Sequence, residues 1–214
     1  MTIQTTELKH LTQIVECHKE AFPDSLSTKL GSTFIAKMME WYIVSERGVL
    51  FHILDEKGKM AGYCGGIVTT EPGMLGAVSS ISQYAFNSFV WAYFRRPWLL
   101  LHKENIKKWR SIVKNIAIKT SLRKSSESPQ KDINEGFLPF LGLVVIGVKQ
   151  VNRGSGFGSC LLKEFEKRAK ARKDIQKIQL SVKAENKQAL NAYLRNGWEI
   201  RREDPKTKQL SKNL

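Results

Sequence analysis

The residues best suited to chemistry in this sequence form a glycine-rich turn that follows an apolar stretch. Gly154, Gly156 and Gly158 come directly after Arg153. Glycines let the backbone turn tightly and bring several N–H groups close to one point. At the start of a helix such groups lack partners within the helix, and the helix dipole adds positive charge, which suits a phosphate or pyrophosphate. The Arg153 guanidinium can add a direct cationic contact.

Two common phosphate-binding motifs do not fit this turn. A P-loop requires Gly-Lys-Ser/Thr at its end, whereas Gly158 is followed by Ser159 and Cys160. A dinucleotide-binding turn requires GxGxxG/A, and counting from Gly154 leaves a serine at the last position. The next predicted strand also ends without the acidic residue that would bind the ribose. The turn therefore belongs to neither class.

A third motif fits, and a second block downstream supports it. The turn resembles the Arg/Gln-x-x-Gly-x-Gly/Ala signature of the GNAT family of N-acetyltransferases in Arg153, Gly154, Ser155, Gly156, Phe157 and Gly158. The segment 181–200 resembles the second conserved block of the family in Asn186, Ala189, Tyr193, Gly197 and Trp198. The two blocks occur in the family's order and at its usual separation. The resemblance is strong over residues 137–202, weak over 1–70, and does not extend to 74–136.

This resemblance implies transfer of an acetyl group from acetyl-CoA to a primary amine. In the family, the fourth and fifth strands diverge and leave backbone N–H groups unpaired near Val148. One such group can polarise the thioester carbonyl, and others can hold the pantetheine arm as an added strand. The pyrophosphate would lie on the glycine turn, and Asn186 would hydrogen-bond the pantetheine. The expected cofactor-binding residues are Ile146, Gly147, Val148, Arg153, Gly154, Ser155, Gly156, Phe157, Gly158, Ser159 and Asn186.

Tyr193 matches the general acid of the family. A phenol with a pKa of about 10 can return a proton to the leaving thiolate, since free thiols titrate near about 8.5. The alternative is a tyrosine that packs in the core on an amphipathic helix. The base that deprotonates the attacking ammonium is not identifiable. Its candidates, which can equally be solvated surface residues, are Glu135, His18, Glu20 and Asp24.

The elements that must position these residues alternate between helices and strands. Periodic apolar residues predict helices over residues 7–21 and from Ser27 or Ser32 to Ser45. Two strands, 49–54 and 60–70, flank a hairpin turn. The apolar run 137–148 predicts a strand buried on both faces. A helix over 154–170, a strand over 177–182, a helix over 186–195 and a strand over 198–202 follow.

We predict a mixed α/β (α+β) fold with a mainly antiparallel central sheet flanked by helices, of the acyl-CoA N-acyltransferase type. Residues 1–214 would form a single domain. The family usually ends in a full antiparallel hairpin. Because little sequence follows Trp198, we expect the last strand to be short, near 208–212, or to come from a partner chain.

We predict that residues 74–136 form a helical insertion into this domain. The stretch 77–119 is rich in aromatic residues, and residues 95–131 contain eleven Lys or Arg against two Glu. We expect the aromatic residues to pack the insertion onto the core and the basic residues Arg95, Arg96, Lys107 and Lys108 to meet an anionic acceptor. The competing view makes the segment a lid or dimer contact held by Trp91, Phe94 and Trp98.

The composition fits a folded domain with a strongly basic surface. With 214 residues, 42% of them hydrophobic, the chain is long enough to bury a core. Its formal net charge of +15 attracts anions, although a solvated basic surface without such a partner fits as well. We expect a small-molecule amine acceptor, phosphorylated or nucleotide-linked, and consider nucleic acid unlikely. Two other functions stay open: an inactive acyltransferase-like module that binds a polyanion, and an acetyltransferase that acts on a protein amine.

The cysteines and the N-terminal residues bear on the cellular compartment. Cys17, Cys64 and Cys160 are widely separated, so neither a metal site nor a disulfide framework is expected, and the thiols should be buried or partly buried. Residues 1–11 lack the apolar stretch of a secretory signal. The apolar segment 85–101 is interrupted by charge and proline, whereas a membrane span needs roughly 18–20 apolar residues. We expect a cytoplasmic protein, with a homodimer or contact with a membrane surface compatible with the sequence.

Overall fold

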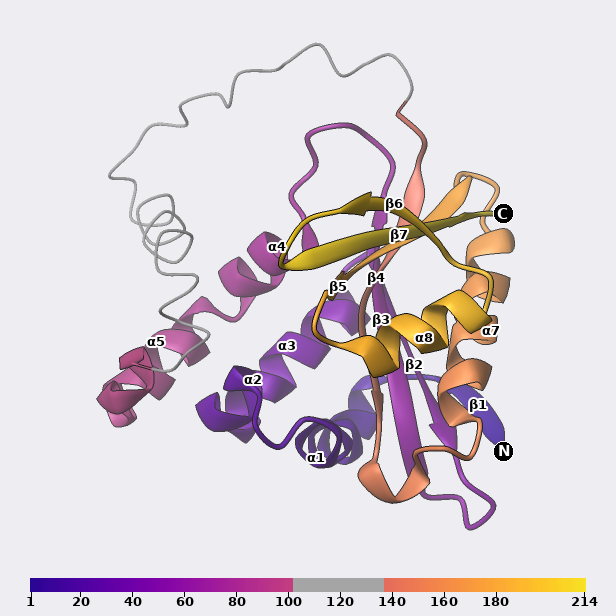
Figure 1. Cartoon of the computed structure of the whole chain (residues 1–214). Helices are drawn as coiled ribbons and strands as arrows, with labels where there is room; N and C mark the ends of the chain where they lie inside the picture. The colour runs from indigo at the N-terminus through magenta and orange to yellow at the C-terminus, as the bar shows by residue number, and fades with distance from the viewer. Residues whose placement is uncertain (102–136) are drawn as a thin grey trace.

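The computed structural model describes residues 1–101 and 137–214, which form a seven-stranded sheet between two layers of helices (Figure 1). The strands lie in the order β1-β2-β3-β4-β5-β7-β6, and all neighbours are antiparallel except the parallel pair β4 and β5. This confirms the predicted mixed, mainly antiparallel sheet. The strands are β1 Thr2–Thr5, β2 Gly48–Leu54, β3 Met60–Thr69, β4 Phe140–Val148, β5 Lys177–Lys183, β6 Glu199–Glu203 and β7 Thr207–Asn213.

The helices follow the predicted order, and of the two predicted starts of the second helix the structure has Ser32. A separate short helix precedes it, because Gly31 has a φ of 103° between the two and Ser25 caps the first by accepting from the Thr28 N–H at 3.2 Å. No described helix is long and apolar enough to cross a bilayer. The helices are η1 Leu8–His10, α1 Leu11–Ala21, α2 Leu26–Leu30, α3 Ser32–Val44, α4 Ala77–Tyr84, α5 Phe86–Arg95, η2 Pro97–Leu101, η3 Gln150–Asn152, α7 Phe157–Lys170 and α8 Lys187–Arg195.

The alternation of side chains along β2 and β3 divides the core between the two faces of the sheet. Phe51 and Cys64 point to the face covered by α7, where they pack with Phe165. Leu50 and Tyr63 point to the opposite face, which α1 and α3 cover. Burial of each such large side chain contributes about 1.5–3 kcal/mol of transfer free energy. The strand that carries the predicted cofactor residues, β4, is therefore held from both sides.

The three cysteines are free thiols, as the sequence predicts. Cys17 and Cys64 are buried, and Cys160 is partly buried. Burial raises the pKa of the Cys17 thiol to about 12, and it also raises the pKa of Cys64 well above its ordinary value. These two thiols therefore act as small apolar core residues.

Two strands differ from the sequence expectations. β1 was not predicted, because it is an exposed edge strand with one partly buried apolar residue, Ile3. β7 runs from Thr207 to Asn213, longer than expected, and pairs with both β5 and β6. The alternative of a last strand supplied by a partner chain is therefore wrong. The strand was hard to recognise because Leu210 is its single apolar residue, although this side chain is fully buried.

Helices α4 and α5 lie within the predicted insertion and form an arm beside α2 and α3 (Figure 1). Phe89, Ala92 and Tyr93 pack on Leu30 and Phe34, so this part of the arm contacts the core as expected. The remainder of the predicted insertion, including the loop predicted near 125–129 and the basic residues at 107 and 108, lies outside the described residues.

Three other aromatic residues of the arm do not pack on the core. The exposed fractions are 56% for Trp91, 79% for Phe94 and 64% for Trp98. The expectation that the aromatic residues fix the insertion to the core is therefore wrong for these three. The two basic residues of the arm are also engaged locally: Arg95 lies 5.6 Å from the Trp91 ring centroid, and Arg96 donates to the Lys29 carbonyl at 2.6 Å.

Candidate functional site

The parallel strands β4 and β5 separate halfway along their length. They pair only where residues 140–143 face residues 177–180. Beyond this point β4 continues along β3 as far as Val148, while β5 continues along β7 as far as Lys183. The register between β3 and β4 shifts at the same place, which leaves Val144 as a bulge. Bulges of this kind terminate pairing and re-aim backbone groups next to active sites.

The opening between the strands exposes backbone N–H groups of β4. The Lys149 N–H donates to the Ala61 carbonyl at 2.9 Å, so the N–H group of residue 149 points from β4 towards β3. Since hydrogen bonding alternates along an antiparallel pair, the N–H groups of Ile146 and Val148 point to the other side, where no described strand pairs with them. Buried N–H groups are almost always hydrogen-bonded, so this edge is ready to accept an extended ligand.

Gly147 of β4 lies against the end of α1 and the residue that follows it. A Cβ atom there would lie 2.8 Å from the Phe22 ring and 2.9 Å from the Tyr63 ring. Only glycine therefore allows the end of α1 and the turn after it to rest on β4. The side chains of Ile146 and Val148 pack towards the α7 face of the sheet. Gly147 between them faces α1 on the opposite side.

The glycine turn leads into an uncapped helix N-terminus. Gly154 and Gly156 both have a φ of 82°, in the left-handed region that favours glycine. The first backbone hydrogen bond of α7 runs from the Cys160 N–H to the Gly156 carbonyl at 3.0 Å, so the N–H groups of residues 157–159 precede it and lack helical acceptors. No side chain caps this terminus, and the space around the glycines is open. The geometry fits a diphosphate group.

The remaining predicted residues of the turn have distinct positions. Phe157 is buried in the core beneath the turn, whereas Ser155 and Ser159 are exposed. The Arg153 guanidinium turns back, with Nη2 donating to the Ala21 carbonyl at 2.7 Å and Nε donating to the Val148 carbonyl at 3.3 Å. In this structure Arg153 therefore joins the end of α1 to the end of β4 and forms one side of the glycine turn.

Asn186 and Tyr193 lie at opposite ends of α8. Asn186 caps the helix, since its Oδ1 accepts from the Ala189 N–H at 3.1 Å, which leaves its Nδ2 as the donor group for a ligand. Tyr193 is 8% exposed and belongs to the core cluster that contains Cys64, the β3 residue opposite Ile146. Burial raises the pKa of the Tyr193 hydroxyl to about 12, with a further contribution from Cys64. The phenol is therefore protonated at neutral pH and lies on the side of the opening covered by α7.

The structure separates the candidates for the general base. The Glu20 carboxylate is paired with Lys149 at 2.9 Å, and Asp24, whose side chain is 90% exposed, lies 3.8 Å from Lys29. Glu135 is outside the described residues. None of the described candidates has the buried, unpaired geometry expected of a tuned base.

Both ring nitrogens of His18 are engaged in this structure, so neither is free to accept a proton from an amine. Burial raises the pKa of Tyr63 well above its ordinary value, so this hydroxyl stays protonated. It therefore donates to His18 Nδ1 at 2.5 Å, and we assign the ring proton to Nε2, which donates to the Ser27 hydroxyl at 2.7 Å. This chain of hydrogen bonds fixes the end of α1 and the turn to α2 beside β4, a positioning role that the sequence did not suggest.

The stability of the protein should fall in mild acid because of His18. Burial lowers the pKa of His18 from 6.5 to about 4, so between about pH 4 and pH 6.5 His18 is protonated in the unfolded chain and neutral in the folded chain. The contribution of His18 to the free energy of unfolding is complete above pH 6.5. It is lost progressively as the pH falls to about 4, at about 1.4 kcal/mol per pH unit. Denaturant unfolding measured across this range should show the slope, and His18→Gln should reduce it by that amount. An unchanged slope in the variant would contradict the assignment.

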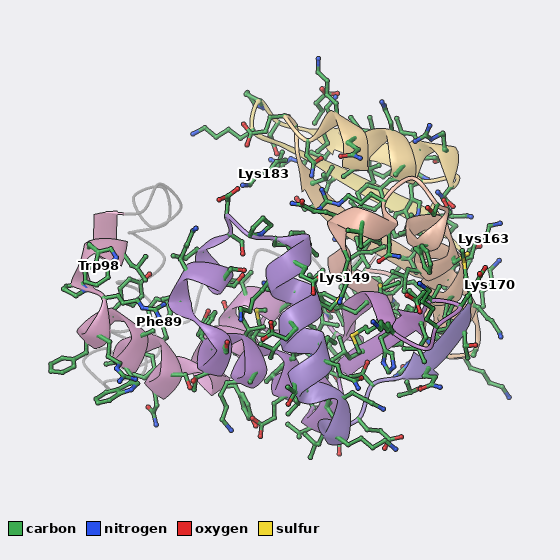
Figure 2. The ribbon with its side chains drawn as sticks, turned by 90° about the horizontal axis from the view of Figure 1, so that it is seen from below. Phe89, Trp98, Lys149, Lys163, Lys170 and Lys183 are labelled. Atoms are coloured by element: carbon green, nitrogen blue, oxygen red, sulfur yellow. The ribbon has the colours of Figure 1, made fainter. Side chains whose placement is uncertain are left out.

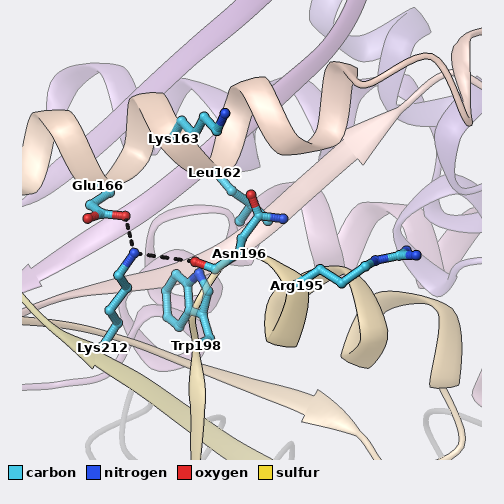
Figure 3. A pocket seen from close by; sticks show the side chains of 7 residues that line it. All are labelled: Leu162, Lys163, Glu166, Arg195, Asn196, Trp198 and Lys212. Carbon is cyan, nitrogen blue, oxygen red and sulfur yellow. Dashed lines mark hydrogen bonds and ion pairs between the residues drawn. The ribbon is translucent and has the colours of Figure 1, made fainter.

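A pocket of about 280 Å³ lies beside this site, between α7 and α8 (Figure 3). Within it Lys212 donates to Glu166 at 2.7 Å and to the Asn196 carbonyl at 3.3 Å. Asn196 also reaches the Ser159 hydroxyl at 3.4 Å, which connects the pocket to the first turn of α7. None of the predicted cofactor residues lines the pocket, so it is distinct from the opening between β4 and β5. It is lined by Leu162, Lys163, Glu166, Arg195, Asn196, Trp198 and Lys212.

Comparisons with known proteins agree with this geometry. Residues 132–198 match the family model described as Acetyltransferase (GNAT) family. Three solved structures have the same fold. NAA60 of Arabidopsis thaliana in complex with acetyl-CoA has a TM-score of 0.58 and 12% identity, over 100% of this chain and 98% of that chain. The PaiA N-acetyltransferase of Thermoplasma acidophilum in complex with coenzyme A has a TM-score of 0.57 and 12% identity, over 100% and 98% of the two chains, and the ribosomal-protein-S18-alanine N-acetyltransferase of Escherichia coli has a TM-score of 0.52 and 15% identity, over 99% and 92%. A comparison with curated proteins found no match. At these identities the structural likeness demonstrates the fold.

Proposed function

We propose that this chain, whose residues 132–198 match the GNAT acetyltransferase family, transfers an acetyl group from acetyl-CoA to the primary amine of a small acceptor that carries phosphate or a sugar. The family match and the acyl-CoA N-acyltransferase fold support acetyl-CoA-dependent N-acetylation. The observation that carries the proposal is the opening between β4 and β5, where β4 presents backbone N–H groups that no described strand pairs with.

The backbone supplies the binding groups of the proposed site. The N–H groups at the start of α7, together with the open space at Gly154 and Gly156, would hold the diphosphate of the cofactor. The edge of β4 at Ile146 and Val148 would hydrogen-bond the pantetheine arm as a sheet receives an added strand, with Asn186 Nδ2 as a further donor. When bound, acetyl-CoA would supply an activated thioester.

The residues then support attack of a neutral amine on that thioester. An N–H of β4 would stabilise the negative charge that develops on the carbonyl oxygen. As the C–N bond forms and the C–S bond breaks, Tyr193 would donate its proton to the sulfur and regain one from solvent, while the extra proton on the newly acetylated nitrogen would leave to solvent or to a carboxylate. The raised pKa of Tyr193 makes this transfer less favourable than from an ordinary phenol.

A thiol-release assay tests this function directly. The purified chain is incubated with acetyl-CoA and a panel of amines: aminosugars, their phosphates and nucleotide conjugates, polyamines, and peptides with a free N-terminus. Release of coenzyme A with an aminosugar phosphate or conjugate supports the proposal, whereas turnover with peptides alone shifts the acceptor to a protein amine. Absence of turnover with every acceptor, together with measurable coenzyme A binding, would favour the inactive binding module.

If the basic residues of 95–131 recognise an anionic acceptor, neutralising them should affect the acceptor and not the cofactor. Arg95→Gln, Lys107→Gln and Lys108→Gln combined should raise the acceptor KM and leave coenzyme A affinity unchanged, and the effect should shrink with salt because exposed charges are screened beyond about 8–10 Å. Arg96 is left intact because its guanidinium joins α5 to α2. The control neutralises Lys57 and Lys59 in the β2–β3 turn. An equal acceptor KM in both variants would remove the basis for an anionic acceptor.

A further inference from the structure

Helix α5 is apolar on two opposite sides, and only one of them is covered by the described core. Phe89, Ala92 and Tyr93 pack against α2 and α3. The other side, with the start of η2, carries four large apolar side chains with exposed fractions of 48% to 79%, which we call the aromatic face: Val90, Trp91, Phe94 and Trp98. A helix that is apolar all round is normally buried, so a second surface is expected to cover the aromatic face.

The shape and the charge of the arm indicate what that surface is. Figures 1 and 2 show α5 and Trp98 on an arm that projects from the body of the molecule, away from Lys163 and Lys170 on α7. Trp91 and Phe94 stack with ring centroids 5.8 Å apart. Residues 74–101 contain two arginines and no Asp or Glu, and Arg95 lies over the Trp91 ring. The face is therefore aromatic, lies on a projecting arm and carries the positive charge of Arg95.

We infer that the aromatic face of α5 and η2 binds the surface of an anionic lipid bilayer. Trp side chains favour the boundary between headgroups and acyl chains, because the indole is apolar and its N–H can still be hydrated. The arginine beside them complements anionic headgroups, and the net charge of +15 adds long-range attraction. The helix would lie in the plane of the interface. This inference does not rest on the proposed acetyl transfer.

Vesicle sedimentation of the whole chain provides the test. The vesicles contain either phosphatidylcholine alone or a mixture of phosphatidylcholine and phosphatidylglycerol, at low and high salt. The wild-type protein should bind the mixed vesicles, more weakly at high salt. The triple variant Trp91→Ala, Phe94→Ala and Trp98→Ala should bind them at least about tenfold more weakly, because it loses the apolar transfer free energy of three side chains. All three are exposed, so the variant should fold.

The matched control removes three exposed apolar side chains elsewhere, in Leu8→Ala, Val44→Ala and Val151→Ala, and should bind the mixed vesicles like the wild type. A wild-type protein that does not sediment with the mixed vesicles would overturn the inference. So would a triple variant that binds as well as the wild type, which would indicate attraction by charge alone. Solution mass is measured in parallel: a wild-type dimer that ignores vesicles and becomes a monomer in the triple variant would show that a second copy covers the face.

Discussion

Gly156→Glu is expected to abolish coenzyme A binding while the protein remains folded. The new side chain would occupy the open space above the first turn of α7, where the N–H groups of residues 157–159 have no helical acceptor. Its carboxylate would compete for these donors and repel the diphosphate. The φ of 82° at this position adds a backbone cost of about 1–3 kcal/mol for any residue with a side chain. Calorimetric titration with coenzyme A measures the loss.

A matched glycine separates the two effects. Gly73 also has a φ of 82° and open surroundings, and it lies in the loop after β3. Gly73→Glu should therefore carry a similar backbone cost and bind coenzyme A like the wild type. Wild-type affinity in a folded Gly156→Glu protein would place the cofactor elsewhere, and equal loss of affinity in both variants would mean that backbone strain alone explains the result.

Tyr193→Phe should lower turnover by roughly 10²- to 10⁴-fold, the range for loss of general acid–base help. The substitution keeps the ring that packs near Trp198, with centroids 6.0 Å apart, and removes only the hydroxyl. Coenzyme A affinity should stay near the wild-type value, because the phenol is expected to act on the leaving sulfur and not on the diphosphate. The measurement is the steady-state rate at saturating acetyl-CoA with the best acceptor.

The control for this variant is Tyr42→Phe, which removes a buried hydroxyl on the opposite face of the sheet. Burial raises the pKa of Tyr42 above its ordinary value as well, so the two tyrosines differ mainly in location. Turnover of Tyr42→Phe should match the wild type. Equal rates for Tyr193→Phe and the wild type, with chemistry shown to be rate-limiting, would identify Tyr193 as a packing residue.

Much of the fold could be predicted because its signals are local. The turn between β2 and β3 contains Asp55, whose Oδ1 accepts from the N–H groups of Lys57 and Lys59, both at 2.9 Å, and Gly58 with a φ of 70°. These residues specify the turn by their own chemistry. The start of the second helix was left open between Ser27 and Ser32, and the edge strand β1 was missed, because a single glycine or a few threonines are weak signals without the neighbouring elements.

The candidate site likewise has features that the sequence predicts locally and features that depend on contacts between distant residues. The glycine turn was recognisable, since positive φ values and free N–H groups follow from residues adjacent in the sequence. The bulge at Val144 depends on the register with β3, which no local pattern encodes. The contact between His18 and Tyr63 joins residues 45 positions apart, and the turn of Arg153 towards Ala21 spans 132 positions. Such contacts arise only when α1 docks on the sheet.

The short pairing of β4 with β5 divides the sheet mechanically. Within residues 1–101 and 137–214, the pairing of 140–143 with 177–180 is the only strand pairing between the four N-terminal strands and the three C-terminal ones. We expect such a seam to open locally before the rest of the sheet, so amide hydrogens beside it should exchange at a free energy below that of global unfolding. A ligand that hydrogen-bonds along β4 would hold the two halves of the sheet in one arrangement. Its binding would stabilise this arrangement by mass action, so amide hydrogens of the C-terminal strands should exchange more slowly when the ligand is bound.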